Sequence, residues 1–181
     1  MRALADPAVH VVGMGNILYR DEGVGVYAAR CLQTCYRFTP EIDVVDGATL
    51  GFSLMDLFEP GARIVVLDAL MADAPAGSIY RLSREQLLEL GPAVQPTAHE
   101  VEPLELLKLS EVLGEPPDMV LMGIVPADAQ TMQLGLTPQL AAAFPAYLDA
   151  VVHELRAAGV EAERVRKPSL DGVVESLVTR A

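Results

Sequence analysis

Short apolar runs alternate with segments of helix-spaced apolar residues along most of the chain. The runs, rich in β-branched residues, predict strands at residues 9–12, 42–45, 63–67, 77–82, 118–125 and 160–165. Apolar positions three or four residues apart predict helices at residues 22–36, 50–58, 83–90, 103–113 and 137–159. Strands that alternate with helices in this way are typical of an α/β fold with a largely parallel central sheet.

The chain contains no internal repeat, linker or low-complexity segment that would divide it. We therefore expect one domain over residues 1–166, followed by a C-terminal tail over residues 167–181 that contains at most a weak helix. Two of the predicted helices have recognisable starts. Ser83 and Gln86 have the spacing of a capping box, and Thr137 precedes a proline at the first helical position.

Composition excludes several classes of protein. Of the 181 residues, 51% are hydrophobic and 21% charged, which is too apolar for a disordered chain. No apolar run approaches the ~20 residues that span a bilayer, and the N-terminus lacks the apolar stretch of a signal peptide. A net charge of −12 disfavours nucleic acid as a partner, because phosphates need clustered cations.

The two cysteines, Cys31 and Cys35, lie four residues apart on a predicted helix, where we expect buried free thiols. Free thiols favour the cytoplasm, and we also expect the protein to be a monomer.

Conspicuous polar residues follow three of the predicted strands. Asp21 and Glu22 follow the first strand, Asp46 the second and Asp68 the third. Because ligands of such sheets bind beyond the carboxyl ends of the strands, these side chains are candidates for a shared site. Each carboxylate could instead cap a turn or a helix.

Only one of the three histidines has a sequence context that suits a site. His10 lies inside the first strand and is expected in the core, and His153 lies off the apolar stripe of its helix. His99 lies in a proline-rich loop before a helix start. Two carboxylates with one imidazole suit nickel or zinc with open coordination positions, and the same groups could serve as acid and base. Spacing alone leaves both roles open.

Three common catalytic or nucleotide-binding motifs are absent. The turn at residues 13–16 has Leu18 where a dinucleotide fingerprint needs glycine, and no Gly-Lys-Ser/Thr triplet marks a phosphate loop. Ser53 follows Gly51-Phe52 but lacks the second glycine of a serine hydrolase elbow. The sequence thus disfavours nucleotide binding and serine hydrolase chemistry.

Six segments, taken in order, resemble the hydrogenase maturation endopeptidases, which trim the large subunit of nickel-iron hydrogenases. The first segment, residues 13–26, reads Gly-Met-Gly-Asn-Ile-Leu-Tyr-Arg-Asp-Glu-Gly-Val-Gly-Val and is highly specific. The others are Val45-Asp46-Gly47-Ala48-Thr49, Val65-Val66-Leu67-Asp68-Ala69, Ala98-His99-Glu100, Gly123-Ile124-Val125-Pro126 and Gly135-Leu136-Thr137. The resemblance covers residues 9 to about 159. It departs at Ala48, where the family often has a second glycine.

This resemblance implies a fold, a reaction and a site. The family fold is a three-layer α/β/α sandwich around a twisted, mostly parallel sheet. Glu22, Asp68 and His99 fall on the family's metal-binding positions, where the metal is nickel already installed in the hydrogenase large-subunit precursor. The implied activity is removal of a C-terminal extension from that precursor after nickel insertion, without a serine or cysteine nucleophile. Asp46 is our candidate for an assisting acid or base.

Two alternatives remain open on the sequence. A non-catalytic nickel-sensing maturation checkpoint or chaperone would need the same three metal-binding residues. A metal-dependent hydrolase of small peptides, similar to an aminopeptidase, would need a richer two-metal ligand set than one useful histidine provides.

Overall fold

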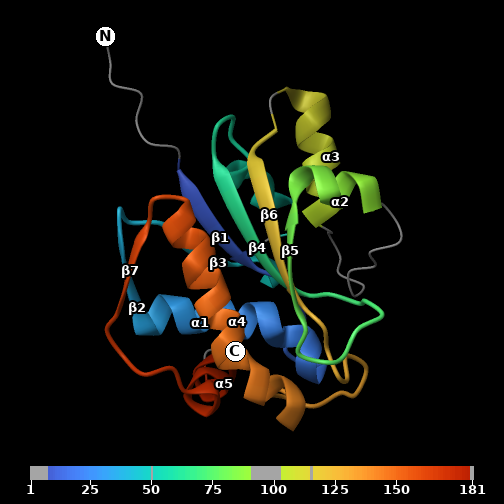
Figure 1. Cartoon of the computed structure of the whole chain (residues 1–181), viewed down its shortest axis with the longest axis vertical. Coiled ribbons are helices and arrows are strands. Elements are labelled where there is room, and N and C mark those ends of the chain that lie inside the picture. The colour runs from blue at the N-terminus through green and yellow to red at the C-terminus, as the bar shows by residue number, and fades with distance from the viewer. Residues whose placement is uncertain (1–7, 50, 91–102, 115, 180–181) are drawn as a thin grey trace.

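The computed structural model of the chain has a five-stranded central sheet, and it describes residues 8–49, 51–90, 103–114 and 116–179. The strand order is β3 (Asp43–Asp46), β1 (Val9–Gly13), β4 (Arg63–Ala69), β6 (Asp118–Ile124) and β5 (Ile79–Ser83) (Figure 1). The first four strands are parallel, and β5 pairs with β6 in the antiparallel sense at one edge. The predicted α/β class with a mostly parallel sheet is confirmed.

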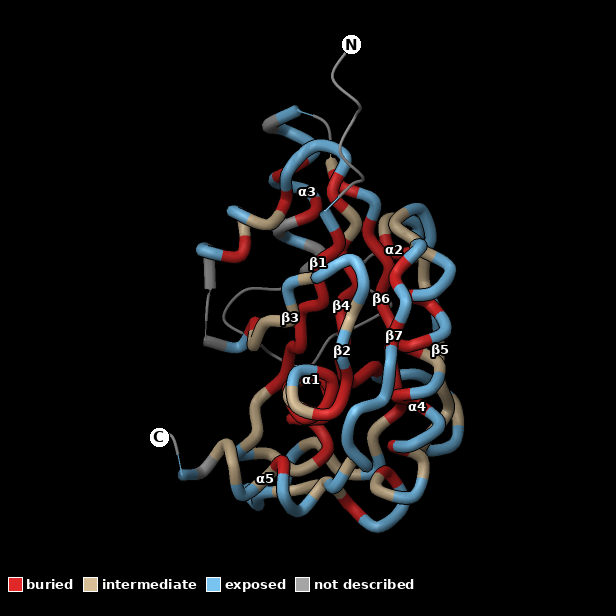
Figure 2. Tube along the Cα trace, turned by 90° about the vertical axis from the view of Figure 1, so that its left-hand side faces the viewer, coloured by how far each residue is buried: buried red, intermediate tan, exposed pale blue. Residues whose placement is uncertain are grey.

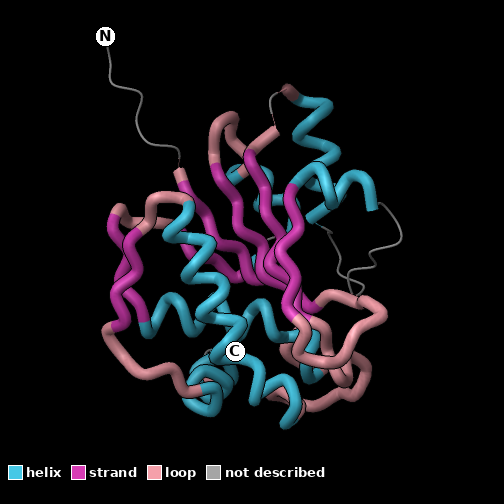
Figure 3. The backbone as a smooth tube through the Cα atoms, in the orientation of Figure 1, coloured by secondary structure: helices cyan, strands magenta, loops and turns pink. Residues whose placement is uncertain are grey.

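Helices cover both faces of this sheet (Figure 3). One face packs on α1 (Val24–Cys35) and α4 (Pro138–Ala157). The other packs on the 3-10 helix η3 (Gly51–Leu57), α2 (Arg84–Leu90) and α3 (Pro103–Leu113). Alternate residues of a strand pack into the two hydrophobic cores on opposite faces of the sheet. In β4, Val65 and Leu67 belong to the core that contains α1 and α4. Ile64 and Val66 belong to the core that contains η3. Figure 2 shows that the strands of the central sheet are largely buried and that most exposed residues lie in the segments around them. The result is the expected three-layer arrangement.

A second, two-stranded sheet was not predicted in full. The helix that we expected to reach Tyr36 ends at Cys35, and β2 (Tyr36–Thr39) then pairs antiparallel with β7 (Glu161–Arg164). Tyr36 stacks on Phe38, with ring centroids 6.3 Å apart, and the Arg164 guanidinium lies 5.5 Å from the Tyr36 ring centroid. These contacts favour an extended conformation directly after the helix.

The segment that we expected to be a tail contains a packed helix. Helix α5 (Leu170–Val178) is capped by Ser169, whose Oγ accepts a hydrogen bond from Gly172 N at 3.3 Å. Val173 is buried in the core shared with α1, and Ser176 Oγ accepts a hydrogen bond from Arg30 Nε at 3.2 Å. This helix therefore belongs to the folded body of the protein.

Several local predictions are confirmed by hydrogen bonds and burial. Ser83 N donates to Gln86 Oε1 at 2.8 Å, as a capping box requires, and Thr137 Oγ1 accepts from Leu140 N at 3.3 Å. Cys31 and Cys35 are buried free thiols. His10 is buried beside Asp43 and His153 is exposed. None of the described helices is long and apolar enough to cross a membrane.

Candidate active site

The carboxyl edge of the parallel strands brings two of the predicted site carboxylates to one end of the sheet. Gly13, the last residue of β1, pairs with Asp46 on one side and with Leu67 on the other. Asp68 follows Leu67, so Asp46 and Asp68 flank the end of β1. Since neighbouring strands lie about 4.8 Å apart, their backbones are separated by roughly 10 Å.

The glycine-rich segment after β1 turns back against these strand ends. Met14 N donates to Leu67 O at 2.8 Å. Gly15 has a φ of +124°, and a Cβ there would lie 1.9 Å from the carbonyl oxygen of Glu22. A Cβ on Gly25 would lie 2.1 Å from Leu67 O. Only glycine permits approaches this close, and they hold Glu22 at the edge that carries Asp68.

Asp21 is a structural anchor and not a site residue. Its side chain is fully buried and accepts four hydrogen bonds, from Ala127 N, Asp128 N, Thr137 N and Thr137 Oγ1, at 2.6 to 3.0 Å. These bonds tie the segment after β1 to the loop that leads from β6 into α4. A buried carboxylate with this many donors is fully compensated.

Glu22 and Asp68 are almost fully buried, with exposed fractions of 6% and 2%. Asp68 Oδ1 accepts a hydrogen bond from Ala69 N at 2.7 Å. The Tyr147 hydroxyl of α4 donates a hydrogen bond to Met122 O at 2.6 Å. The pKa of Tyr147 is raised mainly by burial and, to a smaller extent, by the charge of Asp68. Both carboxylates lie at the edge where ligands of parallel sheets bind, so they are candidates for holding a positively charged group.

Asp46 lies in a different environment. It is half-buried at the end of β3, and its Oδ1 accepts a hydrogen bond from Ala48 N at 3.1 Å. Burial raises the pKa of the Asp46 carboxyl, and the bond from Ala48 partly opposes that shift. The residue thus both caps the following turn and has the shifted acidity expected of a proton-transfer group.

His99 lies outside the described residues. Among the described residues, no group of three or more His, Cys, Asp or Glu side chains could hold a metal ion. The set Glu22, Asp68 and His99 therefore stays a prediction, of which the structure brings the two carboxylates to the same edge of the sheet.

Sequence reasoning missed Arg20, whose backbone conformation is unusual. With a φ of 44°, Arg20 is the only non-glycine residue of the described chain in the left-handed region. Bulky residues adopt this region rarely and at a cost, and here the backbone is held by the bond from Arg20 N to Gln133 O at 2.8 Å. Ala48, where the chain departs from the resembling family, has no positive φ and needs no glycine.

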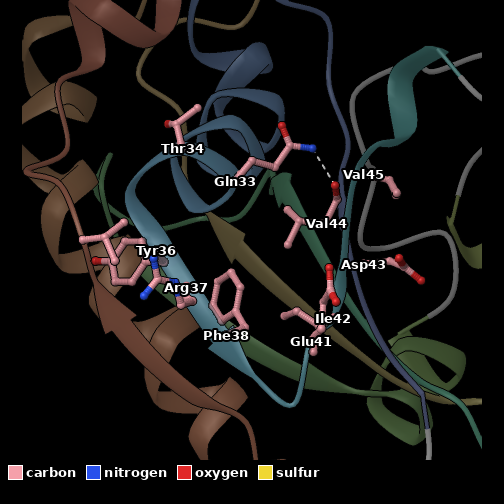
Figure 4. Close-up of a pocket in the computed structure, with 11 residues that line it drawn as sticks. Gln33, Thr34, Tyr36, Arg37, Phe38, Glu41, Ile42, Asp43, Val44 and Val45 are labelled. Carbon is pink, nitrogen blue, oxygen red and sulfur yellow. Dashed lines mark hydrogen bonds between the residues drawn. The ribbon is translucent and has the colours of Figure 1, made fainter.

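A pocket of about 710 Å³ lies elsewhere, between α1, β2 and the free side of β3 (Figure 4). Gln33 Nε2 of α1 crosses it to donate to Val44 O at 2.5 Å, and Arg37, Phe38 and Asp43 line it. Glu22 and Asp68 do not line this pocket, so it is separate from the candidate site.

Comparison with known proteins identifies the class. A family model described as hydrogenase maturation protease matches residues 26–154. The chain is 29% identical to the hydrogenase expression/formation protein HupD of Thiocapsa roseopersicina, over 92% of this chain and 76% of that protein. It is 28% identical to the hydrogenase 2 maturation protease of Escherichia coli, over 84% of this chain and 93% of that protein.

Solved structures agree. The hydrogenase maturating endopeptidase HybD of Escherichia coli superposes with a TM-score of 0.74 at 28% identity, covering 87% of this chain and 98% of that one. The [NiFe] hydrogenase maturation protease HybD of Thermococcus kodakarensis gives 0.66 at 25% identity, covering 82% and 98%. The chain belongs to the hydrogenase maturation protease family. It is accordingly a peptide hydrolase, as the resemblance in its sequence implied.

Proposed function

We propose that this protein is the endopeptidase that removes the C-terminal extension of a nickel-iron hydrogenase large-subunit precursor once nickel has been inserted. Glu22, Asp68 and His99 bind the nickel carried by the precursor, and Asp46 assists as acid or base. Membership of the maturation protease family supports the reaction class. The observation that carries the site is the burial of two carboxylates, Glu22 and Asp68, at one edge of the sheet.

In this proposal the nickel is part of the substrate. Three side-chain ligands leave coordination positions open, so the thiolates of the precursor can stay on the metal while the protease engages it. Glu22 and Asp68 are buried, and a carboxylate in a low-dielectric surrounding attracts a cation more strongly than an exposed one does. Bound nickel would polarise the scissile carbonyl or orient the attacking water.

Asp46 supplies the proton transfer in this scheme. Because burial raises its pKa, the carboxyl is a better base when ionised, and a better match to neutral pH, than an exposed aspartate. Asp46 lies on the strand next to β1 on one side and Asp68 on the strand next to it on the other, so the two carboxylates are about two strand spacings apart along one edge of the sheet.

The cysteines do not suit a covalent mechanism. Burial, with the adjacent Cys35, raises the pKa of Cys31 to about 12, so the thiol stays protonated at neutral pH. A thiolate is the nucleophilic form, and it is disfavoured at Cys31. We further propose that the protein acts as a monomer in the cytoplasm, where free thiols persist.

Intact mass of the large subunit tests this function. Incubation with nickel-loaded precursor should shorten the large subunit at its C-terminus by one peptide, and inhibitors of serine or cysteine proteases should not prevent it. Binding of the precursor without any change of mass would instead support a non-catalytic checkpoint.

A further inference from the structure

Large exposed apolar side chains gather at the carboxyl edge of the sheet. The described chain has seven such residues, and four of them lie in the loops that follow β1, β4 and β6: Leu18, Met71, Met132 and Leu134. Their exposed fractions are 51%, 50%, 70% and 41%. The loops after β4 and β6 lie beside the start of α1 in Figure 1, and Asp21, the residue before Glu22, accepts hydrogen bonds from Ala127 N and Asp128 N of the loop after β6.

Three of these exposed residues lie one position away from a single β-bridge. Tyr19 and Gln133 form an isolated parallel β-bridge, and Arg20 N donates to Gln133 O at 2.8 Å. The bridge joins the two segments, so Leu18 and Met132, which directly precede the bridged residues, lie on neighbouring segments. Leu134 directly follows Gln133, so it too belongs to the bridged segment. We call Leu18, Met132 and Leu134 the apolar platform.

The backbone under the apolar platform is firmly held. Asp21 accepts two hydrogen bonds from the start of the loop after β6 and two from Thr137 at its end. Asp128 Oδ1 accepts from Gln130 N and Thr131 N, each at 3.0 Å, and bonds with Thr131 and Gln130 lower the pKa of Asp128 to about 2. The Tyr27 hydroxyl accepts from Gly135 N at 3.0 Å. The backbone of this loop is held in place while Met132 and Leu134 stay exposed, and preorganised surfaces lose little entropy on binding.

We propose that the apolar platform is the docking surface for the folded body of the protein substrate. This inference rests on the proposed function, since the substrate is the precursor whose cleaved segment reaches Glu22. Single exposed apolar residues are ordinary, but a cluster on a rigid loop beside a peptidase site is typical of a protein interface. Methionine adapts well to a partner surface. A net charge of −12 disfavours an anionic membrane as the occupant.

The test uses a double variant of the full chain, Leu18→Ser with Met132→Ser. Its matched control is Val112→Ser with Val165→Ser, which removes two side chains with exposed fractions of 83% and 50% outside these loops. The Kd for nickel-loaded precursor and the kcat and KM of cleavage are measured for wild type and both variants. We expect the Kd and KM of the platform variant to rise about tenfold with kcat unchanged, because a few central side chains dominate such interfaces. The control should match wild type.

Each outcome separates this inference from the proposed function. If the platform variant keeps the wild-type Kd and KM and still cleaves the precursor, the docking role of the apolar platform is wrong and the proposed function stands. Platform-dependent binding without cleavage by wild type would overturn the endopeptidase and keep the platform. A platform variant that instead loses self-association on gel filtration, or binding to anionic vesicles, at unchanged precursor Kd would assign the surface to those partners. Thermal melts check folding. If the double variant unfolds, the single variants Leu18→Ala and Met132→Ala decide the question.

Discussion

Gly25 of α1 lies directly against the carbonyl oxygen of Leu67, the residue before Asp68, so that a Cβ on Gly25 would lie 2.1 Å from that oxygen. Met14 O would lie 2.3 Å away, so the added methyl group has backbone on two sides and cannot be accommodated by a rotamer change. This contact sets the distance between the segment that carries Glu22 and the strand that carries Asp68.

Gly25→Ala should therefore disturb both stability and the site. We expect a loss of about 1–3 kcal/mol in the free energy of unfolding, as for other overpacked positions, together with a loss of precursor cleavage. Urea denaturation and the cleavage assay measure the two effects. Gly172→Ala is the matched control, because a Cβ there meets only Ser169 at ordinary distances of 3.5 Å and more. Equal behaviour of the two variants would show that the close approach at Gly25 is not needed.

Asp21→Asn should destabilise the protein without altering a charge that contacts substrate. The amide cannot accept hydrogen bonds at both ends, so at least one of the four donors, such as Thr137 N, is left buried and unpaired. We expect a loss of about 2–3 kcal/mol in the free energy of unfolding. Asp56→Asn, at an exposed position, is the control. A neutral Asp21→Asn would contradict the anchoring role.

A third prediction concerns pH. Glu154 is 4% exposed and bonds Arg63 and Arg81, the latter through Arg81 Nε at 2.6 Å. Burial opposes ionisation, but the hydrogen bonds and charges of the two arginines win and lower the pKa of Glu154. A carboxyl with a lowered folded-state pKa stabilises the fold above its unfolded pKa, and the stabilisation is lost as pH falls through the folded value.

Glu154→Gln should thus lower the free energy of unfolding most near pH 7, by about 1–3 kcal/mol. The loss stays in this range because the arginine partners are themselves partly exposed. The difference from wild type should shrink as pH falls below the ordinary glutamate range. Chemical denaturation at pH 7 and in mild acid measures it, with the exposed Glu161→Gln as reference. A difference that grows toward acid pH would contradict the ion-pair assignment.

Asp46→Asn tests the assisting acid or base. The variant should bind nickel-loaded precursor with wild-type Kd but lower kcat about 10²-fold or more, the usual contribution of a positioned proton-transfer group. Its fold should persist, because the side chain is only half-buried. Asp43→Asn, on the same strand and exposed, is the control and should cleave normally. Wild-type kcat in Asp46→Asn would contradict the role of that residue as an acid or base and leave it a structural one, such as its capping bond with Ala48 N.

Local sequence pattern was sufficient to predict most of the sheet and the edge at which the carboxylates lie. It failed where distant segments decide the structure. β2 was missed because its four residues gain their pairing from β7, more than a hundred residues later. The anchoring role of Asp21 depends on donors such as Thr137 N, 116 positions away, and could not be distinguished from a helix-start carboxylate. The packing of α5 on α1 has the same origin. By contrast, the glycines at 15 and 25 belong to a motif that carried the family resemblance, and the structure supplies their physical reason.

The nickel dependence of cleavage tests the central claim most directly. Nickel-loaded and nickel-free precursor are incubated with the protein after brief chelator treatment of the protease alone, and the intact mass of the large subunit is followed. His99→Ala, Glu22→Gln and Asp68→Asn are run beside wild type, with melting curves as folding controls. If these residues read the nickel of the substrate, wild type cleaves only the loaded precursor, the chelator has no effect, and each variant fails to cleave it. Equal cleavage of both precursor forms by wild type would contradict the account.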